Sequence, residues 1–229
     1  MNTSGLLAFK EHDFITRIID MNNPREILQY QELRYELKVK KFKWVTAPSP
    51  NRRLDYDKYD SHSVHFGVFN SNGVLVACSR LILPAMGQRL QIIDEFGDLL
   101  NPEEKRNLQL DNSVEVSTVL VSDDYKRRNG SKYHMTQMLY KIMGQWCIAK
   151  KRRFWHAITN KKILRAFKFQ GFPFRIIGGS KFYQGEVLYP AAVDLEMCYE
   201  GLLRIDSSVY QWYLEGLDFK GKGDPPKIL

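Results

Sequence analysis

The hydrophobic pattern is clearest in two β-rich runs, residues 64–69 and 74–82, which a short polar turn separates. The turn contains Asn72 followed by Gly73, a pair that readily adopts the positive φ angles of a tight hairpin loop. β-Branched and aromatic residues dominate both runs, as is usual for strands. The segment therefore predicts an antiparallel hairpin.

The other elements follow from the spacing of apolar residues. Helical spacing recurs over residues 25–40, 131–150 and 160–169, the last ending near Gly171, and residues 94–110 indicate a helix and a loop. Strands are predicted at residues 113–121, 154–158, 172–177 and 187–195, and a long polar loop at residues 46–59. This order predicts an α/β fold with a mixed, largely antiparallel sheet flanked by helices, and not an alternating βαβ fold.

Length and composition narrow the class of protein. The chain has 229 residues, of which 44% are hydrophobic, so we expect a single domain over residues 1–219 and a loose tail over residues 220–229. No apolar run is long enough for a membrane span, and no secretory signal is visible at the N-terminus. The three widely spaced cysteines, Cys78, Cys147 and Cys198, favour buried, reduced thiols in a cytoplasmic protein. No Cys/His spacing predicts a metal site.

The formal net charge of +8 indicates an acidic partner: nucleic acid, anionic lipid, a phosphate-bearing ligand or an acidic protein. A basic module that binds nucleic acid is therefore one hypothesis. It predicts basic residues along one helix face with interleaved aromatics. In this chain the basic residues are spread over several elements, and no helix-turn-helix spacing is present, so we expect no nucleic-acid partner.

One predicted strand carries a pair of residues suited to acyl transfer. A period of two places Glu115 and Ser117 on the same face of the strand at residues 113–121. An amine with a pKa of about 8 must lose a proton before it attacks a thioester, and a nearby carboxylate can take that proton. The Ser117 hydroxyl can donate a hydrogen bond to the acyl oxygen. A surface Glu and Ser without a catalytic role is the alternative.

A second candidate is the loop at residues 54–60, where acidic residues alternate with tyrosines. Carboxylates and aromatic rings together suit a cationic ligand such as a sulfonium or an ammonium. Arg80 ends an otherwise apolar strand, where an arginine rarely lacks an anionic partner. Asp57, Asp60 or a substrate carboxylate can supply that partner.

Taken in order, these pieces resemble a known family. The family signature is similar to Leu33-Arg34-Tyr35, Trp44-Val45, Asp57-Lys58-Tyr59-Asp60, the strand ending in Arg80, and Val114-Glu115-Val116-Ser117. The family is that of the N-acyl-homoserine-lactone (autoinducer) synthases. Residues 164–193 also look similar, and Arg127-x-x-Gly130 resembles the acyl-CoA pyrophosphate loop of the Gcn5-related N-acetyltransferase superfamily to which these synthases belong.

The resemblance implies a Gcn5-related fold with an acyl-chain tunnel. It also implies transfer of a fatty acyl group from acyl carrier protein to the amine of S-adenosylmethionine, a substrate rather than a cofactor, with lactonisation giving a quorum-sensing signal. Glu115 and Ser117 would be catalytic. The small amine substrate would meet Arg34, Trp44, Asp57, Asp60, Arg80 and Thr118. The acyl chain would meet Met135, Met138, Leu139, Ile142 and Met143. The acidic carrier protein would meet Lys126, Arg127, Arg128, Lys150, Lys151, Arg152 and Arg153.

Two departures concern the amine side. The family usually has an aromatic residue four positions after the arginine, where this chain has Lys38, and an arginine directly after the serine, where it has Thr118. Relatives that make N-acyl amino acids share the acyl side and differ on the amine side. An N-acyl amino acid synthase that uses acyl carrier protein and a free amino acid is therefore the close alternative.

Overall fold

The computed structural model describes residues 8–45, 53–108, 111–125, 133–183 and 185–217. The chain divides into two compact units. Unit 1 comprises Met1–Leu83 and Val116–Met143, and unit 2 comprises Pro84–Glu115 and Gly144–Leu229. Strand β5 (Ser113–Val121) and helix α4 (Met135–Ala149) contribute residues to both units. The single domain and the tail remain predictions, and the tail lies outside the described residues.

Unit 1 is built on an antiparallel meander that contains the predicted hairpin. Its strands are β1 (Ala8–Glu11), β2 (Phe14–Ile18), β3 (Ser63–Phe69) and β4 (Leu75–Ile82), followed in the sheet by β5. Between β3 and β4 the Asn70 side chain accepts the N–H groups of Asn72 and Val74, and Gly73 has a φ of 73°. The hairpin prediction is confirmed. Strands β1 and β2 were not predicted, because their short runs mix charged and apolar residues.

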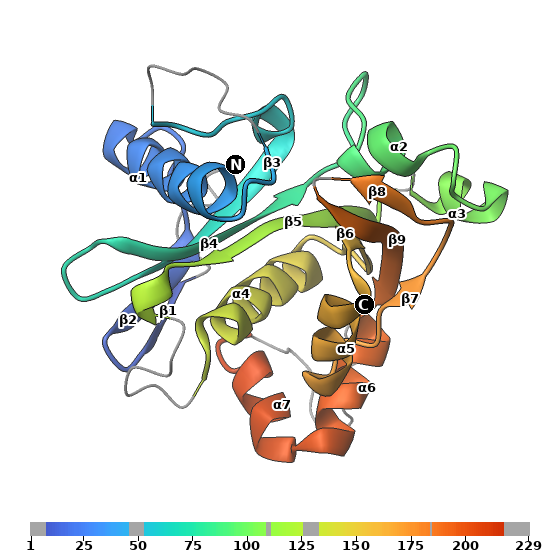
Figure 1. Cartoon of the computed structure of the whole chain (residues 1–229). Helices are drawn as coiled ribbons and strands as arrows, with labels where there is room; N and C mark the ends of the chain where they lie inside the picture. Colours follow the sequence, from blue (N-terminus) through green and yellow to red (C-terminus); the bar gives the residue numbers. More distant parts are fainter. Residues whose placement is uncertain (1–7, 46–52, 109–110, 126–132, 184, 218–229) are drawn as a thin grey trace. The chain divides into compact units, whose positions relative to one another are not determined.

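A helix covers this sheet and changes its winding near its end. Helix α1 (Pro24–Arg34) begins after Asn23, whose side chain accepts the Arg25 N–H. It continues as a π-helix, η1 (Tyr35–Lys41), in which the Phe42 N–H reaches back to the Leu37 carbonyl. Figure 1 shows α1 in blue, beside β3 and β4. The core between them is formed by Ile19, Tyr30, Leu37, Phe69, Leu75, Cys78 and Leu120.

Unit 2 has its own strands and helices. The first three residues of β5 pair in parallel with β6 (Phe154–Thr159), and β6 is antiparallel to β9 (Glu186–Asp194). The short strands β7 (Arg175–Ile176) and β8 (Lys181–Tyr183) are also antiparallel to β9. The helices are α2 (Gln91–Phe96), α3 (Pro102–Asn107), α5 (Lys161–Phe169), α6 (Leu195–Ile205) and α7 (Ser207–Leu214). Two 3-10 turns of unit 1, η2 (Asp60–His62) and η3 (Asp123–Tyr125), complete the described elements.

Some predicted boundaries in unit 2 are wrong. Leu195 does not end a strand but begins α6, because the Asp194 side chain accepts the Glu196 N–H and caps the helix. Strand β7 takes only Arg175–Ile176 of the predicted strand at residues 172–177, although the Ile177 N–H also donates to the Pro190 carbonyl of β9. The helix at residues 160–169 is confirmed as α5, and Gly171 follows it with a φ of 88°. Helices α6 and α7 and strand β8 were not predicted.

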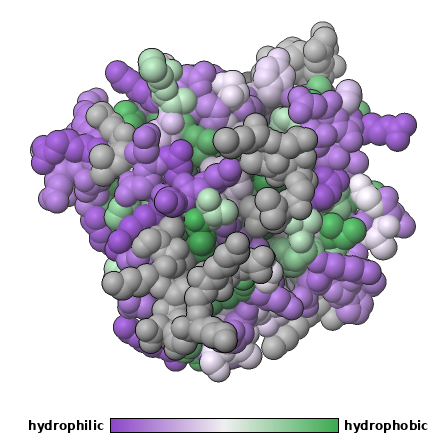
Figure 2. Space-filling view, turned by 180° about the vertical axis from the view of Figure 1, so that it is seen from behind, coloured by the Kyte–Doolittle hydropathy of each residue, from purple (hydrophilic) through white to green (hydrophobic). Residues whose placement is uncertain are grey.

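The predicted fold class is confirmed: the chain is mixed α/β, with a largely antiparallel sheet flanked by helices. The three cysteines are buried and unpaired, as predicted. Hydrophilic residues predominate among the described residues on the face shown in Figure 2. None of the helices in the described part of the chain has the length and apolar character that crossing a membrane requires.

Candidate functional site

The most unusual feature of unit 1 is a fully buried arginine that contacts three carboxylates. The Arg34 side chain, at the end of α1, has no exposed surface. Its Nε lies 2.7 Å from Asp55 Oδ2, its Nη2 lies 3.0 Å from Asp57 Oδ2, and its Nη1 lies 2.6 Å from Asp60 Oδ1. A buried charge is tolerated only when its donors are satisfied in this way.

Arg80 on β4 joins the same carboxylates from the sheet. Its Nη1 and Nη2 lie 2.7 and 2.9 Å from the two Asp57 oxygens, and Nη1 also lies 2.7 Å from Asp60 Oδ1. The fork of a guanidinium matches a carboxylate in this bidentate geometry. Both aspartates named from the sequence are thus partners of Arg80. Arg34, Asp57, Asp60 and Arg80, which are far apart in the sequence, come together in one network.

The Asp-x-x-Asp spacing is explained by the turn that it forms. Asp60 Oδ2 accepts the Asp57 N–H, and Asp57 Oδ1 accepts the Tyr59 N–H, so each carboxylate fixes the backbone that carries it. Burial opposes ionisation of Asp57, but the hydrogen bond and the charge of Arg80, together with Arg34, hold its pKa well below the usual range. The pKa of Asp60 is lowered by the two arginines against the same burial penalty. Both carboxylates are therefore charged at neutral pH.

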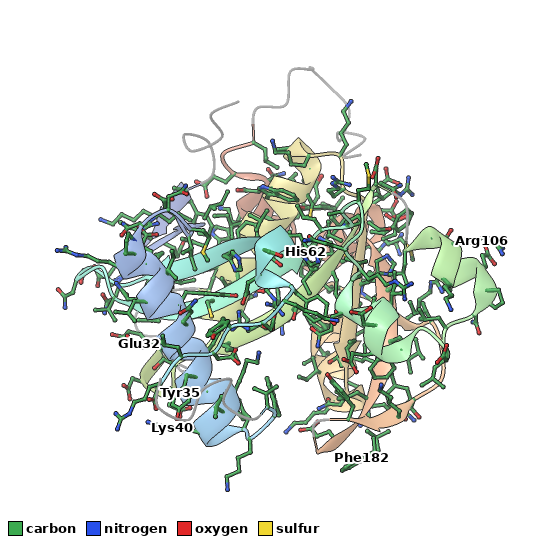
Figure 3. The ribbon with its side chains drawn as sticks, turned by 90° about the horizontal axis from the view of Figure 1, so that it is seen from above. Glu32, Tyr35, Lys40, His62, Arg106 and Phe182 are labelled. Atoms are coloured by element: carbon green, nitrogen blue, oxygen red, sulfur yellow. The ribbon has the colours of Figure 1, made fainter. Side chains whose placement is uncertain are left out.

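Lys38 is a member of the network that the sequence marked only as a departure from the family. It lies in η1, four residues after Arg34, and its Nζ is 2.9 Å from Asp55 Oδ2. Burial and the neighbouring arginine charges lower its pKa, while Asp55 raises it. Figure 3 shows Glu32, Tyr35 and Lys40 in succession along the same helix. Glu32 and Lys40 are exposed, whereas Arg34 and Lys38 are buried.

His65 lies directly opposite Arg80 in the β3–β4 pairing and packs edge-on against the Tyr30 ring. Burial lowers the pKa of His65 to about 4, so its imidazole is neutral at pH 7 although Nδ1 is 4.0 Å from Asp60 Oδ1. In the unfolded chain the His65 imidazole is protonated near the ordinary histidine pKa of about 6.5. Stability is thus lost as the pH falls from about 6.5 towards 4.

We expect the free energy of unfolding to fall by about 2 kcal/mol more between pH 7 and pH 5 in the wild-type protein than in His65→Gln. Urea titrations at the two pH values measure it. Both proteins share the contribution of His156, a second buried histidine with a pKa of about 3. An equal loss in the two proteins would contradict the assignment to His65.

Trp44, predicted on the amine side, is not a member of the network among the described contacts. Its ring stacks on Phe42 with 4.6 Å between centroids, and it packs against the core cluster under α1. Its backbone N–H donates to the Lys38 carbonyl, which ties the end of η1 to this residue. The contacts describe a packing role, and substrate contact by Trp44 remains a prediction.

In unit 2, the start of β5 carries the predicted catalytic carboxylate. Glu115 is 1% exposed, and its Oε2 accepts the N–H of Ile92, the second residue of α2, at 2.9 Å. Its neighbour across the parallel pair is His156, whose Nε2 is 3.3 Å from Ser113 Oγ. Because Ser113 Oγ donates to the Asn107 carbonyl, His156 donates through Nε2. Glu115 is therefore buried and held by the Ile92 N–H rather than mobile at a surface.

In unit 1, β5 becomes irregular just after the predicted hydroxyl. Thr118 has a φ of 60°, an uncommon value that is strained for a β-branched residue. The Ser117 carbonyl accepts the Ser79 hydroxyl at 3.2 Å, and the Ser117 and Thr118 hydroxyls are 3.2 Å apart. The strand therefore departs from regular geometry at the position where the sequence placed the acyl-oxygen donor. The catalytic roles of Glu115 and Ser117 remain predictions.

The predicted acyl-chain residues lie on the part of α4 that belongs to unit 1. All of them are buried, which a core helix also requires: Met135, Met138, Leu139, Ile142 and Met143. An acyl tunnel therefore remains a prediction.

The predicted carrier-protein surface is described only in part. Lys126, Arg127 and Arg128 lie outside the described residues. Lys150 and Lys151 are exposed, whereas Arg153 lies 2.6 Å from both Asp194 Oδ2 and Glu196 Oε2. Two acidic side chains thus already balance Arg153, and the lysines are the more accessible cations for an acidic partner. A group of His, Cys, Asp or Glu residues arranged to hold a metal ion is not found among the described residues.

Comparison with known proteins gives the type of fold. Residues 33–136 match the family model of the acetyltransferase (GNAT) domain. The chain has a GNAT-like fold. The matched residues include all six side chains joined by these ion pairs and both β5 candidates, Glu115 and Ser117. Comparison with curated proteins gives no matching sequence.

Solved structures extend the likeness to most of the chain. The AHL synthase LasI has a TM-score of 0.66 and 14% identity, over 81% of this chain and 91% of LasI. BjaI, a CoA-dependent acyl-homoserine lactone synthase, has a TM-score of 0.63 and 20% identity, over 83% and 89%. FeeM, an N-acyl amino acid synthase from uncultured soil microbes, has a TM-score of 0.57 and 16% identity, over 83% and 95%. At these identities the likeness is one of fold, and it confirms the predicted Gcn5-related class.

Proposed function

We propose that this protein is an N-acyltransferase that moves a fatty acyl group from acyl carrier protein to the α-amine of an amino-acid-type acceptor. The observation that carries the proposal is the convergence of Arg34, Asp57, Asp60 and Arg80 into one ionised network. These are the residues that the family resemblance assigns to the amine side. The GNAT domain match and the synthase-like fold support the acyl-transfer chemistry.

In the proposed reaction the acceptor amine loses a proton and attacks the thioester carbonyl. The tetrahedral intermediate then collapses, the C–S bond breaks, and the carrier thiolate takes up a proton, leaving an amide and the free carrier thiol. Glu115 would assist removal of the amine proton, and the Ser117 hydroxyl would hydrogen-bond the acyl oxygen. The exposed Lys150 and Lys151 would contribute to the docking surface for the acidic carrier protein.

Two acceptors fit this chemistry. With S-adenosylmethionine, a following lactonisation expels methylthioadenosine and gives an N-acyl-homoserine lactone. This is the product expected from the sequence resemblance, and the names of LasI and BjaI describe synthases of such lactones. With a free amino acid, the reaction stops at the N-acyl amino acid, as the name of FeeM describes. Lys38 is the observation that favours the second acceptor, because it adds a cation on the amine side.

The test is a product assay with the purified full-length chain. We expect an N-acyl amide, identified by mass spectrometry, when acylated carrier protein is incubated with S-adenosylmethionine or with a mixture of amino acids. The same acyl chain on coenzyme A should react more slowly, because the carrier protein supplies the acidic docking surface. Thioester loss no faster than hydrolysis, with every acceptor and both donors, would contradict the proposal. If the protein showed no acyl transfer but bound DNA with an affinity that falls steeply with salt, the result would favour the basic nucleic-acid-binding module instead.

A further inference from the structure

The charges of the Arg34–Arg80 network, defined as Arg34, Lys38, Asp55, Asp57, Asp60 and Arg80, cancel one another. Each member is joined to another by an ion pair of 3.0 Å or less. The six side chains, all within the described part of unit 1, are three cations and three carboxylates. Without the Lys38 ammonium, the same network would carry one net negative charge.

The network is also graded in exposure. The side chains of Arg34 and Arg80 are 0% and 1% exposed, whereas those of Asp57 and Asp60 are 31% and 17% exposed. A ligand from solvent therefore meets the two carboxylates first, with the guanidinium groups behind them. Lys38 is 9% exposed and reaches the network through the deeper Asp55. Its effect on a ligand at Asp57 and Asp60 is thus through its charge and not through direct contact.

We propose that Lys38 determines the acceptor preference of this enzyme, making the site electrically neutral and so favouring a zwitterionic amino acid over a sulfonium-bearing acceptor. This inference rests on the proposed acyl transfer. S-Adenosylmethionine carries an ammonium, a sulfonium and a carboxylate, so its net charge is positive, whereas a free amino acid with an uncharged side chain has none. A neutral network gives no net attraction to the additional cation, and a network with one surplus carboxylate does.

The first variant removes the charge and keeps the shape. In Lys38→Met, Asp55 retains Arg34 Nε as a partner at 2.7 Å, so no carboxylate is left unpaired. We expect the ratio of kcat/KM for S-adenosylmethionine to kcat/KM for the best neutral amino acid to rise about tenfold, the size of one partly screened charge a few ångströms from the ligand. Lys38→Arg keeps the charge and should keep the wild-type ratio within about a factor of two.

A double variant separates charge from packing. Lys38→Met combined with Asp55→Asn removes one cation and one carboxylate, so the network is neutral again. We expect the ratio to return towards the wild-type value, although two side chains now differ. Asp55→Asn alone makes the network positive and should lower the ratio below that of the wild type. Packing damage would not reverse in this pattern.

The outcomes distinguish the two proposals. If the wild-type protein acylates an acceptor but the ratio is the same in Lys38→Met, or the double variant moves it further from the wild type, the role of Lys38 is wrong and the acyltransferase stands. If the wild-type protein acylates no acceptor, the proposed function itself fails. Thermal unfolding of each variant, expected as one cooperative transition, ensures that the ratios are measured on folded protein.

Discussion

Glu115→Gln should lower kcat for acyl transfer by about a hundredfold, the usual contribution of a well-placed general base. The same variant should change the free energy of unfolding by less than about 1 kcal/mol, because the Gln amide oxygen can still accept the Ile92 N–H that Glu115 accepts at 2.9 Å. Turnover is measured under saturating acylated carrier protein, and stability by urea titration. Loss of activity with preserved stability would assign Glu115 to the chemistry.

The pH dependence provides the control for a purely structural role. An α-amine with a pKa of about 8 is deprotonated in solution at high pH, so the need for a protein base decreases there. We expect the defect of Glu115→Gln to shrink about tenfold between pH 7 and pH 9.5. A defect that is constant with pH would indicate that Glu115 only shapes the end of α2. Unchanged turnover at pH 7 would remove it from the mechanism.

Arg80→Met should lower the free energy of unfolding by about 3–5 kcal/mol, the usual cost of removing one partner from a buried ion pair. Among the described contacts, the variant leaves Arg34 as the one arginine that pairs with Asp57 and Asp60, and both carboxylates remain partly enclosed. This cost is a large fraction of the stability of a typical domain. Urea titration at low temperature is therefore the suitable measurement. The free energy of unfolding of Arg80→Lys should lie between those of the wild type and Arg80→Met, since one ammonium cannot replace both forked nitrogens of the guanidinium.

Arg153→Met is the matched control for this prediction. Arg153 also contacts two carboxylates, at 2.6 Å each, but its side chain is 38% exposed. A solvent-exposed ion pair contributes about 0–1 kcal/mol, so this variant should cost less than about 1 kcal/mol. If the two arginine variants were equally stable, burial of the Arg80 network would have no energetic consequence. If Arg80→Met does not fold, the Arg80→Lys titration still decides the comparison.

The sequence predicted the hairpin and β5 well because their signals are local. Asn-Gly between two β-rich runs determines a turn without reference to the rest of the chain. The partners of Arg80 were also predictable, since a charged residue in an apolar strand requires a counter-ion and the neighbouring loop supplied two. Strands β1 and β2 lacked such a signal. Their residues are mixed in polarity, and their pairing with β3 is a tertiary interaction.

Asp55 and Lys38 show where reasoning from the sequence was incomplete. Asp55 was one of several acidic residues in a polar loop, and only the folded chain shows that it is 3% exposed and bound to both Arg34 and Lys38. A lysine four residues after a buried arginine was a usable signal, because both face the same side of a helix. Thr118 shows a different limit. A left-handed residue inside a strand interrupts the period of two, so the pattern beyond it no longer reports which face a side chain occupies.

The π-helical winding of η1 has a consequence for how this segment can change during evolution. A π-helical turn closes with hydrogen bonds between residues five apart, so it holds about one residue more than an α-helical turn. Losing one residue between Arg34 and Lys38 would rotate the ammonium by about 100° around the helix axis and carry it away from Asp55. Losing one residue after Lys38 would shorten only the last part of η1 and leave the Lys38 ammonium in place. Length variation among descendants of this chain should therefore be confined to the second half of η1.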